Sequence, residues 1–208
     1  GTVFYADVRN EFVPSSMEGQ PVPENASRSR NMGVELGVTA RASDRLDLGA
    51  SYTFLDLRLR DFASTVLDST GTPVTVDFSG KLLPGVPQHR VTGEIRVRPS
   101  AAVTLGMQLE WQSVVHVETG NADAGTWYVP GDPVQRVAFR AIPARALVHL
   151  DGAWHLGPAT LVGSVENLFG LRYANPVANE FSGAFYEAGP PASVTLGCRL
   201  TGWGPGPR

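Results

Sequence analysis

The chain has 208 residues, 42% of them hydrophobic, and holds 17 basic against 20 acidic residues, a net charge of −3. That balance excludes the basic surface expected of a nucleic-acid-binding protein, and nowhere do apolar residues form the run of about 20 that a membrane-spanning helix needs. The one cysteine, Cys198, cannot form a disulfide within the chain, and its place on the apolar side of an alternating segment suits a small hydrophobic residue.

Apolar and polar residues alternate with a period of two in eight segments, and this pattern predicts β-strands with one apolar and one polar face. The clearest is segment 103–117, in which apolar residues keep the odd positions and only Ser113 breaks the series. In the first segment the apolar set is Phe4, Ala6 and Val8. The eight segments are 2–13, 34–41, 46–54, 91–97, 103–117, 145–155, 161–166 and 194–200.

Two positions mark where strands are expected to change course. Up to Phe54 the apolar side chains of the third segment occupy even positions, whereas Leu55, Leu57 and Leu59 occupy odd ones. A slip of one residue turns later side chains to the opposite face, so we expect either a β-bulge or the point at which the strand leaves the apolar layer. Asn167 is expected to end another strand, because its side chain can bond the backbone two residues on and it tolerates left-handed conformations.

The connections between segments alternate between short and long. Three are tight turns, at Ser43-Asp44, Pro99-Ser100 and Gly157-Pro158, and the four others run to seventeen residues or more. Short periplasmic turns and long extracellular loops are typical of outer-membrane barrels, whereas loops this long count against a soluble β-sandwich. The long loops are residues 14–30, 62–88, 118–143 and 168–191.

No residue pattern points to catalysis or to a metal centre. The chain has no glycine-rich phosphate loop, nucleophile elbow or paired-cysteine motif, and its four histidines lack the spacing of metal ligands. We therefore expect no enzyme, no cofactor and no bound metal, and we expect His89, His116, His149 and His155 to line a barrel or its rim. Charged residues on the polar phase should face a wet interior and pair across strands. They are Glu35, Arg41, Arg90, Glu94, Arg96, Glu110, Asp151 and Glu166.

The aromatic residues fall into two groups. Tyr52, Phe54, Trp111 and Trp154 lie on the apolar phase near strand ends, where aromatic girdles sit at a membrane interface. The second group lies in the long loops, where rings either pack within their loop or contact a ligand. It comprises Trp127, Tyr128, Tyr173, Phe181, Phe185 and Tyr186.

Several stretches, in their order and spacing, resemble one family. Near the carboxyl terminus these are Glu166-Asn167-Leu168-Phe169, Arg172-Tyr173-Ala174-Asn175-Pro176 and Phe185-Tyr186-Glu187-Ala188-Gly189-Pro190-Pro191. Upstream, residues 31–37 and 50–56 resemble paired strands, and residues 82–90 resemble an entry from loop to strand. Together they resemble the carboxy-terminal end of a TonB-dependent outer-membrane receptor barrel of the siderophore-receptor kind, over nearly all of the chain.

The resemblance implies an all-β fold, an antiparallel transmembrane β-barrel segment that supplies eight strands of a larger barrel of about 22. Residues 1–203 would form these carboxy-terminal strands and residues 204–208 a tail. The implied location is the bacterial cell outer membrane. The pattern alone also allows a complete small eight-stranded outer-membrane barrel with a structural or adhesin role.

The resemblance further implies a receptor that captures a scarce metal chelate, above all a ferric siderophore, or cobalamin, and imports it with energy from the TonB complex. The plug domain and the segment that contacts TonB would lie upstream. The implied partners are this ligand, the TonB complex and outer-membrane lipid, without nucleic acid. Candidate ligand contacts are Tyr128, Arg140, Tyr173 and Asn175, since such a site needs ring surface with oriented donors and a guanidinium can bind an anionic chelate bidentately.

Overall fold

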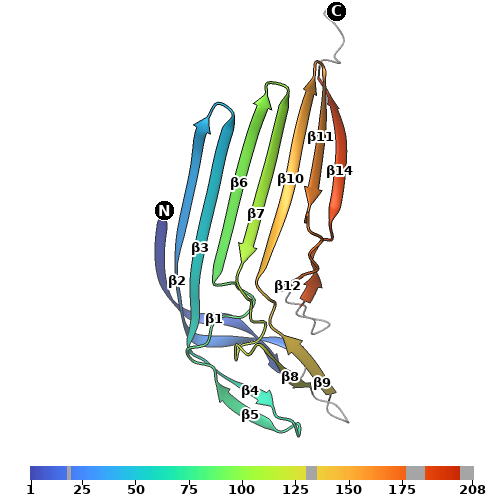
Figure 1. Ribbon diagram of the computed structural model, residues 1–208. Helices are drawn as coiled ribbons and strands as arrows, with labels where there is room; N and C mark the ends of the chain where they lie inside the picture. Colours follow the sequence, from blue (N-terminus) through green and yellow to red (C-terminus); the bar gives the residue numbers. More distant parts are fainter. Residues whose placement is uncertain (18–19, 130–134, 177–185, 202–208) are drawn as a thin grey trace, which may run out of the picture.

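Eight strands form one antiparallel sheet in the computed structural model, which describes residues 1–17, 20–129, 135–176 and 186–201 (Figure 1). Each strand pairs with the next, in the order β1-β2-β3-β6-β7-β10-β11-β14, so the predicted all-β meander of eight main strands is confirmed. The predicted tail, residues 204–208, lies outside the described residues. The strands are β1 (Thr2–Met17), β2 (Gln20–Ser43), β3 (Leu46–Asp61), β6 (His89–Ser100), β7 (Val103–Gln112), β10 (Arg145–Leu156), β11 (Ala159–Glu166) and β14 (Ser193–Leu200).

One end of the sheet, the turn end, carries the tight turns. There the chain reverses within two residues between β2 and β3, between β6 and β7, and between β10 and β11. The last of these turns holds Gly157, whose φ of 60° lies in the left-handed region that glycine adopts without steric cost. The turn predicted at Pro99-Ser100 lies two residues later, at Ala101-Ala102, because Ser100 still pairs with Val103. No helix in the described ranges is long and apolar enough to cross a membrane.

Short hairpins occupy three of the four predicted long loops, at the opposite end of the sheet, which we call the hairpin end (Figure 1). Their strands are only three to six residues long, too short for an alternating pattern to separate them from loop in the sequence. The hairpins are β4 (Ala63–Leu67) with β5 (Pro73–Asp77), β8 (Ala124–Val129) with β9 (Gln135–Arg140), and β12 (Ala174–Pro176) with β13 (Tyr186–Ala188).

The fourth predicted loop, residues 14–30, is wrong, because β1 and β2 stay paired through most of it. The proline, serine and glycine content of this stretch suggested a loop, yet Pro14 lies opposite Pro23 in the ladder. Proline cannot donate to a ladder and is confined to positions where no donor is needed. β2 pairs with β3 only from Arg28 onward, so before that residue one side of β2 has no ladder partner.

The register assigns each residue of the eight-stranded wall to one of two faces. Tyr52, Val91 and Trp111 form one row across β3, β6 and β7, and the next row holds Ser51 and Thr92. Paired residues share a face, so the even positions of 46–54 and the odd positions of 103–111 lie together on what we call the apolar face, as predicted. All eight charged residues predicted to point inward fall on the opposite, polar face.

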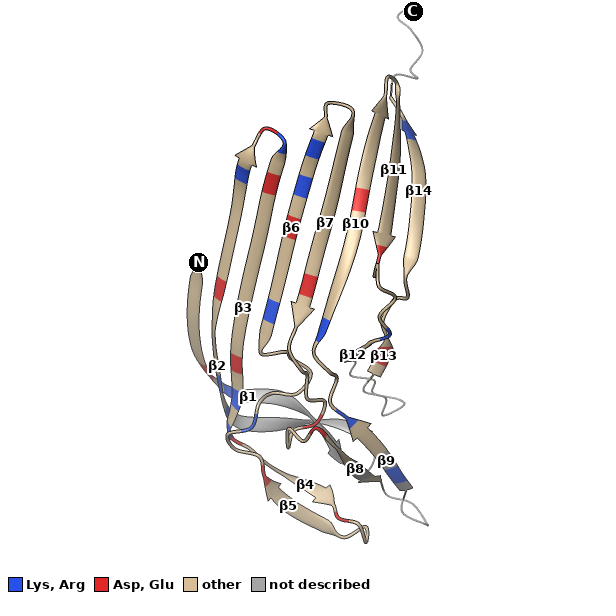
Figure 2. Ribbon diagram, in the orientation of Figure 1, with Lys and Arg blue, Asp and Glu red and all other residues tan. Residues whose placement is uncertain are grey.

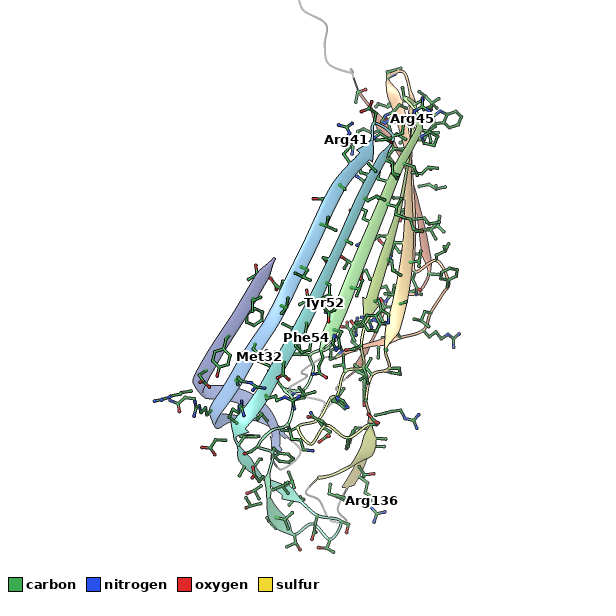
Figure 3. The ribbon with its side chains drawn as sticks, turned by 60° about the vertical axis from the view of Figure 1, so that its left-hand side comes forward. Met32, Arg41, Arg45, Tyr52, Phe54 and Arg136 are labelled. Carbon is green, nitrogen blue, oxygen red and sulfur yellow. The ribbon has the colours of Figure 1, made fainter. Side chains whose placement is uncertain are left out.

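Figure 3 shows how this wall is arranged along its length. Met32, Tyr52 and Phe54 lie toward the hairpin end of the wall, whereas Arg41 and Arg45 mark the turn end. The predicted aromatic residues of β3 therefore sit near one limit of the apolar face, the position expected of girdle residues.

Ion pairs on the polar face only partly follow the prediction of cross-strand pairing. The guanidinium of Arg98, in β6, donates to the carboxylate of Asp47 across the ladder to β3. By contrast, Arg96 Nη2 lies 2.9 Å from Glu94 Oε1 on the same strand. Residues two apart on a strand share a face, so a partner within one strand is as accessible as one across the ladder.

In β1 the predicted apolar residues lie on the polar face. Val3 pairs with Val34, which pairs with Phe54, so Val3 belongs to the apolar face and its neighbour Phe4 does not. Phe4 pairs with Gly33, and a Cβ on this glycine would come within 2.7 Å of the ring Cζ. The absence of a side chain at Gly33 thus makes room for the Phe4 ring. A period of two identifies a strand but does not say which of its faces points outward, which is why the sequence misassigned this one.

The phase change at Phe54 marks the place where β3 leaves the wall. β3 pairs with β6 up to Phe54 opposite His89, while its register with β2 continues through Leu55 without a shift. Of the two predicted alternatives, departure from the apolar layer is therefore right and a bulge at this position is wrong. The register shift with β2 comes later, next to Arg28.

The buried apolar clusters lie beyond the wall, at the hairpin end. Leu59 is fully buried and packs with Phe62, Phe78 and Leu83, which explains the last of the odd-numbered leucines of this stretch. The predicted strand 103–117 likewise ends at Gln112. Its last apolar residues join the second cluster, which consists of Val115, Val117, Phe139 and Ile142. Burying each of these side chains stabilises the hairpins by about 1.5–3 kcal/mol.

Candidate functional site

The residues predicted to contact a ligand lie at the hairpin end of the sheet. β10 begins there, at Arg145, and the hairpins β8–β9 and β12–β13 extend beyond it (Figure 1). Arg145 pairs with Gln112, which in turn pairs with Arg90, so these three residues form one row on the polar face. The candidate site is thus the border between the polar face and the hairpins.

Arg145 connects this border to β12. Its Nη1 donates a hydrogen bond to the carbonyl of Ala174 at 2.7 Å, and its Nη2 donates to Oδ1 of Asn175 at 2.8 Å. Its Cζ lies 4.1 Å from the centre of the Tyr173 ring, a cation–π contact of about 0.5–2 kcal/mol. We call Arg145, Tyr173 and Asn175 the mouth cluster.

The mouth cluster holds a positive charge in partly dry surroundings. Arg145 is partly buried at the start of β10. The arginine nevertheless stays charged, because guanidinium does not deprotonate in proteins. A charge removed from water interacts more strongly with a bound counter-ion than an exposed one does, so the arrangement suits an anionic group presented next to an aromatic ring.

A second group of candidate residues lies on one face of the β8–β9 hairpin. Tyr128 pairs with Arg136, and Arg140, four residues further along β9, is on the same side. The Arg136 guanidinium lies 6.0 Å from the Tyr128 ring centre. The opposite side of β9 carries Phe139, which is buried in the second apolar cluster. That packing fixes the hairpin so that its Tyr/Arg side stays outward.

Tyr186 fastens this hairpin to β13. Its hydroxyl accepts a hydrogen bond from the backbone amide of Arg140 at 2.5 Å and donates one to the carbonyl of the same residue. Both bonds go to the backbone. The Arg140 guanidinium forms no ion pair with any described residue and so remains available to a ligand.

The structure thus places the four predicted contacts in two groups. Tyr173 and Asn175 meet at Arg145, whereas Tyr128 and Arg140 share the β8–β9 face, about 13 Å apart along the strand. That these residues bind a ligand stays a prediction. Phe181 and Phe185, named among the loop aromatics, lie outside the described residues, as does the side chain of Trp127.

Two residues of these groups were missed in the sequence, Arg136 and Arg145. Arg145 starts a strand on its polar phase, directly after a long loop, and that combination of phase and position could have identified it. No pattern in the sequence identifies Arg136, because only the register of the β8–β9 hairpin brings it opposite Tyr128.

Within the described ranges, no three His, Cys, Asp or Glu side chains gather as a possible metal site. The histidines contact neighbouring side chains instead. Nδ1 of His89 lies 2.8 Å from the Tyr52 hydroxyl, with the two rings stacked, and Nε2 of His116 lies 3.3 Å from Oδ1 of Asp123. His89 is on the apolar face near its limit, so it is a rim residue.

Comparison with known proteins gives a consistent result. Residues 1–168 match the family model for the TonB dependent receptor-like β-barrel. The chain is 27% identical over 165 residues to the ferric-pyoverdine M114 receptor PbuA of Pseudomonas sp. strain M114, covering 78% of this chain and 17% of that protein.

Solved structures share the fold. The siderophore receptor PiuA from Acinetobacter baumannii superposes with a TM-score of 0.67 at 18% identity, over 94% of this chain and 24% of that one. The ferric yersiniabactin uptake receptor FyuA from Yersinia pestis superposes with a TM-score of 0.64 at 14% identity, over 95% of this chain and 26% of that one. The chain therefore spans about a quarter of these receptors. Since the family model covers well over half of the sequence, the chain belongs to the TonB-dependent receptor β-barrel family.

Proposed function

We propose that this chain is the carboxy-terminal part of an outer-membrane receptor that binds a metal chelate, a ferric siderophore above all, and imports it with energy from the TonB complex. TonB-dependent receptors are transporters, so the chain belongs to no enzyme family. The observation that carries the proposal is the mouth cluster, in which Arg145 presents a charged guanidinium beside the Tyr173 ring and the Asn175 amide. Ferric chelates commonly combine anionic oxygen donors with an organic ring or chain, and this pairing of charge and ring surface fits them.

The second contact group extends the surface offered to such a ligand. Tyr128, Arg136 and Arg140 share one side of β8–β9, and Tyr186 holds that hairpin beside β13. Two separated groups suit a chelate of some size, because each can bind a different part of it.

The open sheet supports a place in a larger barrel. β1 and β14 stand at opposite edges of the wall, and in the described residues each has a ladder partner on one side only (Figure 1). Unpaired edges are a liability that barrels remove by closure. Further strands from the same protein would pair with these edges, and the plug and the segment that contacts TonB would precede them in the sequence.

The test is ligand binding by intact cells that express the full-length protein carrying this chain. Ferric-siderophore binding would be measured for Arg145→Ala, Arg140→Ala and Tyr128→Ala at matched surface expression. Arg45→Ala is the control. Arg45 lies in a tight turn at the turn end, and its substitution removes the same charge as Arg145→Ala or Arg140→Ala does. We expect the control to bind as the parent does and Arg145→Ala to bind at least tenfold more weakly, in line with the 1.5–3 kcal/mol of a hydrogen bond to a charged group. Unchanged affinity in all three site variants would remove both groups from the ligand site.

A further inference from the structure

The apolar face of the wall ends in a band of charge on β1, β2 and β3 (Figure 2). Val3, Val34 and Phe54 make the last fully apolar row across these strands. Residues on one face are two apart, so each further row lies about 6.6–6.8 Å along the strand. The next rows are Tyr5, Met32 and Asp56, then Asp7, Arg30 and Arg58, then Arg9, Arg28 and Asp61. We call the last two rows, together with Arg60, the arginine band.

Arginine faces arginine twice in these rows. Arg30 lies directly opposite Arg58, and like charges in that position destabilise a sheet. In this first pair both guanidiniums share one counter-ion within the protein. The carboxylate of Asp56, only 5% exposed, lies 2.6 Å from Arg30 Nη2 and 2.7 Å from Arg58 Nε, so one buried acid serves both guanidiniums.

In the second pair, Arg9 opposite Arg28, only Arg28 contacts a counter-ion among the described residues. Arg28 donates to both oxygens of Asp7, at 3.3 and 3.0 Å, and this hydrogen bonding holds the pKa of the Asp7 carboxyl below its usual range. Arg9 forms no ion pair with a described residue. Among the described side chains, therefore, its positive charge has no counter-ion.

Arg60 adds a further positive charge at the same place. The register between β2 and β3 shifts next to Arg28, so that Arg60 is left out of the ladder beside Asp61. Arg60 also forms no ion pair with a described residue. Here the surface has a depression of about 360 Å³, lined by Tyr5, Asp7, Arg28, Arg60 and Asp61.

The first row of the arginine band lies at the depth of the headgroup layer of a membrane, and the second row lies just beyond it. Tyr5 is 64% exposed on the apolar face, as befits an interface aromatic residue. Barrel strands tilt by about 35–45°, so the two arginine rows lie roughly 5 and 10 Å beyond Tyr5 along the membrane normal. Headgroup layers extend about 5–8 Å beyond the hydrocarbon core on each side. At the hairpin end, which outer-membrane barrels expose to the outside, this layer is the outer leaflet's.

We propose that the arginine band binds the phosphate group of a lipid headgroup in the outer leaflet. Arg9 and Arg60 supply the uncompensated charge, and guanidinium groups match phosphate oxygens in bidentate geometry. A lipid fits better than a free phosphate ion because the apolar face continues from the depression through Tyr5 to Val3, where acyl chains can lie. The proposal rests on the outer-membrane placement of the proposed function and is independent of the chelate.

The experiment uses the full-length protein in detergent micelles, titrated with diphosphorylated lipid A, with bound lipid counted by native mass spectrometry. The test variant is Arg9→Gln with Arg60→Gln, which leaves the Arg28–Asp7 pair intact. The control is Arg45→Gln with Arg199→Gln, which removes the same charge near the turn end, since Arg199 lies in β14 opposite Thr160. Each arginine near a membrane surface contributes about 1 kcal/mol of attraction to anionic lipid, so we expect roughly thirtyfold weaker binding for the test variant and none of this loss for the control.

Two further arms identify the source of the phosphate and keep folding separate from binding. Lipid A stripped of its phosphates should bind the parent and the test variant equally, and inorganic phosphate at the same concentration should not displace lipid A. Circular dichroism and the thermal unfolding midpoint check that both variants fold. Equal binding of lipid A by parent and test variant, an equal loss in the control, or displacement by inorganic phosphate would each overturn the proposal. None of these readouts depends on chelate binding, so failure here is distinguishable from failure of the proposed function.

Discussion

Apolar side chains are exposed on the wall of this chain and buried at its hairpin end. On the wall, Leu36 is 52% exposed and Leu105 is 47% exposed, both on the apolar face. At the hairpin end, Leu59 and Val115 are fully buried. A large exposed apolar surface is unusual for a protein in water. The difference indicates that the wall meets hydrocarbon, whereas the hairpins meet water and must build their own small cores.

The polar residues complete the comparison. Carboxylates and guanidiniums on the wall lie on the face opposite the apolar one, whereas the arginine band is on the apolar side, where the strands pass beyond Tyr5. The boundary between the two regions is therefore visible in both kinds of residue, and it falls at the same level on β1, β2 and β3.

The largest expected effect is the presence or absence of surface labelling at the two ends of the sheet. We expect an epitope tag at Gly71, in the β4–β5 hairpin, to be labelled on intact cells, and a tag at Ala101, in the β6–β7 turn, to be labelled only after the outer membrane is opened. The reason is that hairpins and long loops of outer-membrane barrels are extracellular and tight turns periplasmic. Labelling at Ala101 but not at Gly71 on intact cells would reverse the topology.

The next test compares one substitution in both regions. Leu59→Ala removes a fully buried side chain from the first cluster and should cost about 2–5 kcal/mol, because a cavity remains among Phe62, Phe78 and Leu83. Leu36→Ala on the wall should cost less, because lipid chains can fill the space. Urea unfolding of the full-length protein in vesicles, with hydrogen exchange at the Gly80 amide, measures both. Equal costs would mean that the two regions have the same surroundings.

A charge placed on either side of β7 sharpens the comparison within the wall. Leu109 is on the apolar face and Gln108 on the polar face. Leu109→Arg near mid-span should cost about 2–4 kcal/mol, while Gln108→Arg should be tolerated. Folding of the two variants into vesicles would show the difference. Equal tolerance would contradict the assignment of the apolar face to lipid.

Much of the wall could be predicted because its strands obey one simple constraint. Strands with one face toward lipid must alternate, and segments 46–54 and 103–111 do so along their length. The constraint fails for β1, where Phe4 finds room over Gly33 on a different strand. It also fails for residues 14–30, because the β1–β2 ladder continues where no alternating pattern marks it.

The candidate site could be predicted only in part, because its contacts join residues far apart in sequence. Tyr173 and Asn175 were recognisable as loop residues of the right chemistry, but Arg145, which holds them, comes from the start of β10. Arg140 was named for its guanidinium, yet its backbone is fixed by Tyr186, 46 residues away. Such distances are set by hairpin packing, and nothing in local spacing encodes them.

Asn167, at the end of β11, lies on the boundary between the two regions. Its φ of 49° is left-handed, as predicted, but its side chain reaches further than the two residues expected. Oδ1 accepts a hydrogen bond from the Leu171 amide at 2.9 Å, and Nδ2 donates to the carbonyls of Leu171 and Pro190 at 2.9 and 3.2 Å. The side chain thus ties the end of a wall strand to the segment that precedes β14.

We expect Asn167→Ala to cost about 1–3 kcal/mol, the least of these changes, because it removes the hydrogen bonds to the backbone of Leu171 and Pro190 and replaces asparagine, which tolerates positive φ, with alanine, which does not. Asn167→Gly, which tolerates that φ, separates the two causes. If the hydrogen bonds dominate, both variants lose a similar amount of stability in urea unfolding, whereas recovery in the glycine variant would assign the effect to the backbone. A loss confined to hydrogen exchange at Leu171, with the wall amides unaffected, would show that the boundary residue stabilises the hairpin side alone.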